Sequence, residues 1–143
     1  MRPSVDAVWT IGYSGRALEE FLHVLLQARV EVVVDVRELP LSRRKGFSKT
    51  ALSRALESVG IEYRHVRAAG NPFRAQKADI ERCLALYSRH LEQTSAVLEE
   101  LEELLRARRC ALLCFEAEAR VCHRSIISEQ LRQMHPKLVV IDL

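Results

Sequence analysis

The sequence predicts an α/β protein: a single domain with a mostly parallel sheet of about five strands, flanked by helices on both faces. Short apolar or β-branched runs alternate with amphipathic segments along the whole chain. The run EVVVDV at residues 31–36 is apolar on both faces, as is typical of a central strand in a parallel sheet. Repeated strand–helix–strand order in 143 residues implies right-handed crossovers, and this length fits one domain over residues 1–143.

The first elements follow from simple patterns. Residues 7–11 (AVWTI) form a short apolar run and are predicted as a strand. Residues 17–28 repeat apolar side chains at helical spacing, so a helix is predicted there. Its apolar stripe consists of Leu18, Phe21, Leu22 and Leu25.

After the strand at 31–36, the polar loop 37–47 is interrupted by Pro40 and Gly46. A second helix is predicted over about residues 48–59. Ser48 or Thr50 would be its N-cap, and Gly60 would stop it. Residues 61–66 alternate between apolar and polar side chains, which predicts a half-buried strand.

The second half of the chain continues the alternation. Residues 79–109 have helical periodicity and are predicted as two helices that break near Thr94 and Ser95. A strand at 110–115, a helix at 122–134 and a strand at 138–141 complete the fold. On the helix at 122–134, Ile127, Leu131 and Met134 are in register as one apolar stripe. The solvated face of the second helix within 79–109 would carry the acidic run Glu99, Glu100, Glu102 and Glu103.

Composition indicates an ordinary globular protein, with 48% hydrophobic and 29% charged residues. Neither a signal peptide nor an apolar run of membrane-spanning length is present, so we expect a cytoplasmic protein without a membrane partner. In that reducing compartment the four cysteines are expected as thiols, ligands or nucleophiles rather than disulfides. Oligomeric state does not follow from the sequence.

The charge is unevenly distributed although the net charge is only +3. Residues 37–77 contain ten basic and three acidic residues, a net charge of +7. Most of the basic residues in the chain are Arg, whose planar fork suits bidentate contacts to phosphate. A phosphate-containing small molecule or a nucleic acid is therefore a candidate partner, and a solvated basic face is the alternative.

Polar segments follow the predicted strands at 12–16 (GYSGR), 35–47, 66–73 and 114–124. Ligands of parallel sheets bind beyond the carboxyl ends of the strands, so these segments should share one edge. The motifs GYSGR, Asp35-Val36-Arg37 with Pro40, Ser42 and Arg43, LCFE and Cys-His-Arg resemble the bacterial and archaeal family called domain of unknown function 488. The resemblance covers roughly residues 8–131. It implies a similar α/β architecture and no settled activity.

The leading hypothesis is a convergent anion site. Arg124 and Arg16 lie at predicted helix N-termini, where cations are unfavourable by ~0.3 to 1 kcal/mol unless an anion binds there. Arg37 and Arg43 would complete the site, with Tyr13, Ser14 and Ser42 orienting the substrate. The alternative is a structural network in which Asp35 and Glu116 satisfy the arginines internally.

Chemistry at this edge is assigned to four candidate catalytic residues, Asp35, Glu116, His123 and Cys122. Either acid would accept or position a proton, and His123 would act as acid or base. Cys122, at a helix N-terminus beside His and Arg, would have a lowered pKa suited to nucleophilic or redox chemistry. Cys114 alone is most simply a core residue.

No cofactor is assigned, and no metal site is predicted. A zinc site would use Cys114, Cys122, His123 and Glu116, but their spacing fits no standard zinc motif. Two function classes stay open: an enzyme acting on a nucleotide or nucleic acid, and a nucleic-acid-binding module without catalysis. The second would use the basic stretch, with Phe47, Tyr63 and Phe73 for stacking.

Overall fold

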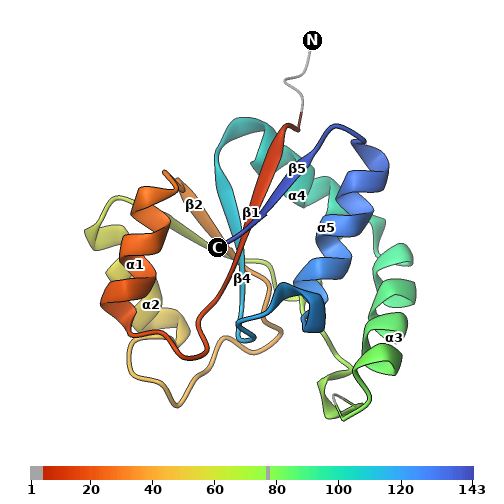
Figure 1. Cartoon of the computed structure of the whole chain (residues 1–143), viewed down its shortest axis with the longest axis horizontal. Helices are drawn as coiled ribbons and strands as arrows, with labels where there is room; N and C mark the ends of the chain where they lie inside the picture. The colour runs from red at the N-terminus through yellow and green to blue at the C-terminus, as the bar shows by residue number, and fades with distance from the viewer. Residues whose placement is uncertain (1–4, 77) are drawn as a thin grey trace.

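A computed structural model describes residues 5–76 and 78–143, and it confirms the predicted fold class. Five parallel strands form one sheet with the spatial order β3-β2-β4-β1-β5 (Figure 1). The strands are β1 (Ala7–Gly12), β2 (Val32–Asp35), β3 (Glu62–His65), β4 (Cys110–Cys114) and β5 (Val139–Asp142).

Helices cover both faces of the sheet. On one face, α1 (Leu18–Gln27) and α2 (Lys49–Ser58) pack on a core that includes Phe21, Leu52 and Leu113. On the other face lie α3 (Ile80–Glu92), α4 (Ser95–Ala107) and α5 (His123–Met134), as Figure 1 shows. The interior strand β2, between β3 and β4, contributes to both cores because its four residues are all buried. Short 3₁₀ turns span Arg67–Ala69, Arg74–Gln76 and Ala119–Val121.

Several predicted boundaries are confirmed. The break between α3 and α4 falls at Thr94, and α2 is followed by Gly60, whose φ of 81° is a conformation that glycine adopts without strain. Ser48 is the N-cap of α2, but its hydroxyl does not cap the helix amides. It accepts a hydrogen bond from the Ser42 amide (3.0 Å) and donates to the Ser42 carbonyl (3.1 Å), which ties the loop 37–47, here called the basic loop, to α2.

Two predictions about side-chain direction are wrong. Met134 is 47% exposed, because it lies in the last turn of α5, beyond the part of the helix that contacts the sheet. Glu102 is buried rather than solvated. Its carboxylate is retained inside because Arg106 (3.1 Å) and His135 (2.9 Å) both pair with it.

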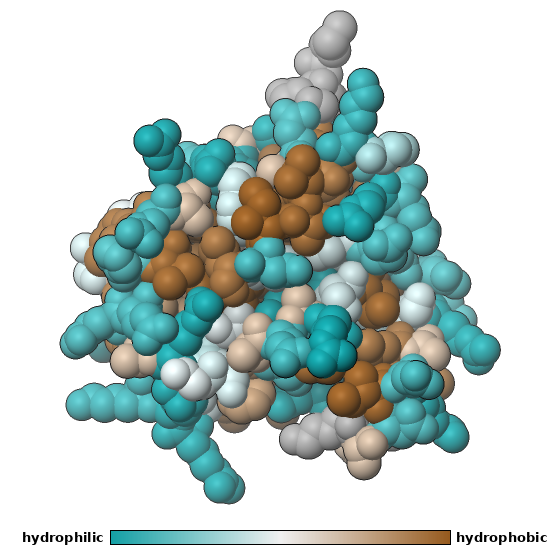
Figure 2. Space-filling view, in the orientation of Figure 1, coloured by the Kyte–Doolittle hydropathy of each residue, from teal (hydrophilic) through white to brown (hydrophobic). Residues whose placement is uncertain are grey.

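The surface has mixed character. Hydrophilic side chains separate the hydrophobic areas on the face that Figure 2 shows. Of the predicted basic stretch, Arg43, Arg44 and Lys45 are exposed, Arg37 is buried, and Lys77 lies outside the described residues. Within residues 5–76 and 78–143, no helix combines the length and the apolar character needed to cross a bilayer.

Candidate functional site

The carboxyl ends of β1, β2 and β4 lie side by side and form the edge on which the site is built. The register pairs Gly12 with Cys114 and Asp35 with Leu113. Gly12 permits the chain after β4 to pass very close to β1, since a Cβ atom at this position would lie 1.7 Å from the Glu116 carbonyl oxygen. Close approach of two backbones therefore sets the path of the loop that leads from β4 to α5.

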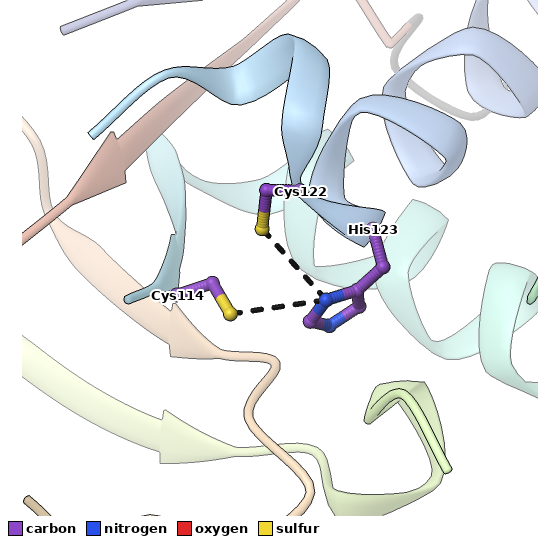
Figure 3. Close-up of side chains that lie close together, drawn as sticks. All are labelled: Cys114, Cys122 and His123. Carbon is purple, nitrogen blue, oxygen red and sulfur yellow. Dashed lines mark hydrogen bonds between the residues drawn. The ribbon is translucent and has the colours of Figure 1, made fainter. Parts of the chain in front are cut away.

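This loop brings two thiols and an imidazole together. Cys114 ends β4, and the chain returns at Cys122, the N-cap residue of α5, followed by His123. The Nδ1 atom of His123 lies 3.8 Å from Cys114 Sγ and 3.7 Å from Cys122 Sγ (Figure 3). The three potential ligand atoms all lie within 4.8 Å of one another, and all three residues are buried. We call these residues the Cys–His cluster.

The imidazole of His123 is held from its other side. Its Nε2 atom lies 2.7 Å from the Val36 carbonyl oxygen at the end of β2. Because a carbonyl only accepts hydrogen bonds, Nε2 must donate, and in the neutral ring Nδ1 then presents a lone pair toward the two sulfur atoms. The Tyr87 ring packs against the imidazole at a centroid distance of 4.9 Å. The ring orientation is therefore fixed by packing and by one hydrogen bond.

The electrostatics of the cluster favour a single thiolate. Burial alone would raise the pKa of the Cys122 thiol, but hydrogen bonds with Cys114 and His123 and the nearby positive charge lower it well below its usual value. The same hydrogen bond, together with burial, raises the pKa of Cys114. Burial would lower the pKa of His123, yet its contact with Cys122 raises it. Negative charge therefore concentrates on Cys122.

Glu116 completes the surroundings of the cluster. Burial, followed by the charge of Cys122, raises the pKa of its carboxyl. Its Oε2 atom is buried and has no hydrogen-bond partner among the described residues. Glu116 lines a pocket with Cys114, His123, Asn71 and Arg74, whose cavity volume is about 30 Å³. This space fits one water molecule or one ion.

Asp35 and Arg37 form a buried ion pair at the end of β2. Asp35 Oδ1 accepts from the Arg37 amide (3.1 Å) and Nε (2.9 Å), and Oδ2 accepts from Arg37 Nη2 at 2.7 Å. Tyr63 also donates to Oδ2 (2.6 Å), and Arg37 Nη1 donates to the Phe47 carbonyl (2.7 Å). His65 lies 2.7 Å from the Arg37 carbonyl. The Asp35–Arg37 pair therefore fits the alternative hypothesis of the sequence analysis, in which carboxylates satisfy the arginines inside the protein.

Arg124 is also engaged inside the protein. It is 1% exposed, and it donates to the carbonyl oxygens of Glu116 (2.7 Å) and Ala117 (3.3 Å). Its Nε atom is buried without a partner among the described residues. Arg124 therefore braces the loop between Cys114 and Cys122. Two of the four arginines of the hypothesised anion site are thus already bonded to protein atoms, and a substrate-binding role for them stays a prediction.

The remaining predicted residues lie around the basic loop. Arg16 lines a hollow with Arg44 and Lys45, separate from the pocket at the Cys–His cluster. The Arg16 carbonyl accepts a hydrogen bond from Arg44, and Arg16 Nη1 is buried without a partner in the described chain. Arg43 is exposed. Arg16 and Arg43 do not line the pocket at the Cys–His cluster, and their role in anion binding stays a prediction.

The predicted orienting residues have structural partners. Tyr13 is buried and stacks on Phe47 at a centroid distance of 4.7 Å, and its hydroxyl accepts from Arg37 at 3.4 Å. Ser14 donates its amide to the Phe115 carbonyl (2.9 Å), and the Ser42 hydroxyl accepts from the Arg44 amide (3.0 Å). Phe47 is 1% exposed, so the expectation that it is available for stacking on bases is wrong.

Sequence reasoning missed three groups that shape the site. Tyr63, taken as a stacking residue, is a partner of Asp35, and the Val36 carbonyl is a partner of His123. Asn71 is buried in the pocket wall, where its amide donates to Cys83 Sγ at 3.3 Å. For Tyr63 the only sequence signal was the alternation of residues 61–66, because every second side chain of a strand lies on the same face of the sheet.

Comparisons with known proteins are limited to the family level. No curated protein and no solved structure matches the chain. A family model does match residues 17–131, with the description "Domain of unknown function DUF488". The Gly12–Arg16 motif lies just before the matched region, whereas the Asp35-Val36-Arg37 and Cys122-His123-Arg124 motifs lie within it. Since the match covers well over half of the sequence, the chain belongs to the DUF488 family.

Proposed function

We propose that the protein is an enzyme whose reaction centre is the pocket between Glu116 and the Cys–His cluster, and that its substrate is a phosphate-containing compound. The observation that supports this most directly is the unpaired Oε2 atom of Glu116, buried beside His123 and Cys114. Leaving a buried polar atom without a partner costs roughly 1–3 kcal/mol. Such a group is accounted for if water or substrate pairs with it during function.

Glu116 takes the role of the residue that accepts or positions a proton. Asp35 was the other candidate, but both of its oxygens already accept hydrogen bonds from Arg37 or Tyr63. His123 has one nitrogen committed to Val36, so only Nδ1 faces the reacting groups. Glu116 Oε2 therefore has free hydrogen-bonding capacity in the pocket that it lines together with His123.

Charge at the same edge supports an anionic substrate. Arg74 lines the pocket and is exposed, and Arg43, Arg44 and Lys45 are exposed on the basic loop. Of these cations only Arg74 lines the pocket itself, and the loop cations lie outside it, where exposed positive charge raises the local concentration of phosphate-containing compounds. The pocket itself holds only one small group, so the bulk of a nucleotide or nucleic acid would lie outside it. A reducing cytoplasmic setting, which keeps the thiols free, belongs to the same proposal.

Glu116→Gln tests the proposal. The variant keeps the size of the side chain but removes the proton acceptor, so turnover of chromogenic phosphomonoesters and phosphodiesters should fall about 10²- to 10⁴-fold. Glu118→Gln is the matched control, because Glu118 lies in the same loop but is exposed and pairs with Arg120. Full activity in Glu116→Gln, or no turnover of either ester class by the unmodified protein, would contradict the proposal.

A nucleic-acid-binding module without catalysis is the second candidate, and the exposed basic loop favours it. The burial of Phe47 removes one of its three stacking side chains. Binding of single-stranded DNA that weakens steeply with salt, and that is unchanged in Glu116→Gln, would favour this candidate over the enzyme.

A further inference from the structure

We infer that the Cys–His cluster is a binding site for a divalent metal ion of the zinc class. The ligands are Cys114 Sγ, Cys122 Sγ and His123 Nδ1, and the fourth coordination position is open toward Glu116 and the pocket. The inference concerns the same pocket as the proposed function. It stands on ligand geometry alone, so it can hold whether or not the substrate is a phosphate ester.

The two sulfur–nitrogen separations match those of a tetrahedral site. With Zn–S of about 2.3 Å and Zn–N of about 2.0–2.1 Å, tetrahedral angles place sulfur and nitrogen ligands about 3.6 Å apart. The two S···N distances are 3.8 Å for Cys114 and 3.7 Å for Cys122. The whole set spans no more than 4.8 Å. The two S···N distances are therefore within a few tenths of an ångström of the tetrahedral value, and the S···S distance, about 3.8 Å in a tetrahedral site, is at most 4.8 Å here.

The tautomer of His123 is the one that a metal ligand requires. Metal-bound imidazoles usually donate their second ring nitrogen to a carbonyl or carboxylate, which fixes the ring and strengthens the ligand. Nε2 of His123 does this with the Val36 carbonyl at 2.7 Å. Figure 3 shows the ring edge with Nδ1 directed at both sulfur atoms. Nδ1 is thus the ring nitrogen that faces both sulfur atoms and is placed to bind a metal ion.

The Val36 carbonyl is itself held in place. The Val36 amide donates to the Leu113 carbonyl (3.0 Å), which fixes the end of β2 against β4. The neighbouring residues on both sides, Asp35 and Arg37, are joined by their buried ion pair. This network therefore acts as an outer shell for the histidine ligand, which explains why a costly buried ion pair lies one residue from the carbonyl.

The ligand set selects the kind of ion. Two thiolates and one imidazole suit zinc, iron or copper, whereas magnesium and calcium prefer oxygen ligands. A divalent cation would neutralise two thiolates, so the centre could stay buried without net charge. Cys110 and Cys83 do not join the set, because Cys110 lies at the opposite end of β4 and Cys83 interacts with Asn71 and Phe73.

The open position distinguishes this site from a purely structural one. Structural zinc sites have four protein ligands, whereas catalytic sites have three and a water molecule. Here three residues converge, and the adjoining cavity of about 30 Å³ has room for one water. Glu116 lines that cavity with an unpaired carboxylate oxygen, where it would accept a hydrogen bond from the bound water.

Titration with Co²⁺ under reducing, oxygen-free conditions tests the site. We expect one equivalent to bind per chain, with thiolate-to-cobalt absorption in the near ultraviolet and visible bands of tetrahedral Co²⁺, and displacement by Zn²⁺. Cys122→Ser and Cys114→Ser should lower the affinity by more than the ~10- to 100-fold typical of losing an outer-shell group. Cys83→Ser is the matched control, since Cys83 is a buried thiol in the wall of the same pocket, and its cobalt spectrum should be unchanged.

A second measurement covers variants that fail to fold. In the unmodified protein, alkylation is followed in mild urea, where burial alone no longer shields Cys114 and Cys122; Zn²⁺ should slow their modification and a chelator should restore it, as located by peptide mass mapping. Absence of thiolate-to-cobalt absorption in the unmodified protein, or equal alkylation rates with Zn²⁺ and with chelator, would overturn the inference. The unmodified protein separates the two proposals, because cobalt binding without phosphoesterase activity would leave the metal site standing and reject the proposed substrate.

Discussion

The buried ion pair between Asp35 and Arg37 makes the sharpest test of the structure. Asp35 is fully buried and accepts four hydrogen bonds, three from Arg37 and one from Tyr63. Asp35→Asn removes the charge and leaves the 3% exposed Arg37 guanidinium unpaired. Breaking a buried pair from one side costs about 3–5 kcal/mol, a large part of the roughly 5–15 kcal/mol that stabilises a domain.

Urea denaturation followed by circular dichroism measures this loss of unfolding free energy. Glu62→Gln is the control, because Glu62 pairs with Arg64 and Arg108 at the surface, where an ion pair contributes about 0–1 kcal/mol. The double variant Asp35→Asn/Arg37→Met should recover part of the loss, since no buried charge is left unpaired. If Asp35→Asn costs no more than Glu62→Gln, the assignment of a buried, structurally required pair is wrong.

Three further predictions address other parts of the molecule. Gly12→Ala should destabilise the fold by about 1–3 kcal/mol or more and alter the Cys–His cluster, because its Cβ would overlap the Glu116 carbonyl. Gly60→Ala is the control: its Cβ would meet open space, so it should cost about 1 kcal/mol in urea denaturation and leave Co²⁺ binding unchanged. Burial raises the pKa of Cys110 from 9.0 to about 12, so the folded state keeps a proton that the unfolded state loses above pH 9. The ionisation of Cys110 should therefore lower the unfolding free energy by about 1.4 kcal/mol between pH 8 and pH 10. Urea titrations at the two pH values should show a smaller decrease in unfolding free energy for Cys110→Ala. Glu102→Gln should lower the unfolding free energy at pH 7 by about 1–3 kcal/mol, because it weakens the pairs with Arg106 and His135; a thermal melt equal to that of the unmodified protein would refute this.

The fold could be predicted because its signals are local. The alternation of strands and helices is visible in periodicity, and Gly60 marks a helix end through its own backbone conformation. Met134 was misplaced because periodicity indicates which face a residue occupies, not how far the partner surface extends along the helix. The burial of Glu102 was missed because its partner His135 lies 33 residues away.

The site was only partly predictable for the same reason. Arginine beside an acid at a strand end fits both a ligand site and an internal ion pair, and only the paired geometry of Asp35 and Arg37 separates them. Cys114 is hidden in the apolar run LLCF, so its sequence context indicates a core residue. Its position beside His123 results from the path of the loop, which depends on the backbone contact at Gly12.

The three ligand atoms of the Cys–His cluster come from one short stretch of chain. The oxygen that orients the imidazole of His123 is the Val36 carbonyl, which lies 87 positions earlier in the sequence. An isolated peptide spanning β4 and α5 would contain every sulfur and nitrogen donor, yet its histidine would rotate freely. Separation of β2 from β4 would disorder the Cys–His cluster even while α5 remained helical. Metal binding at the Cys–His cluster would thus report whether β2 and β4 are still paired.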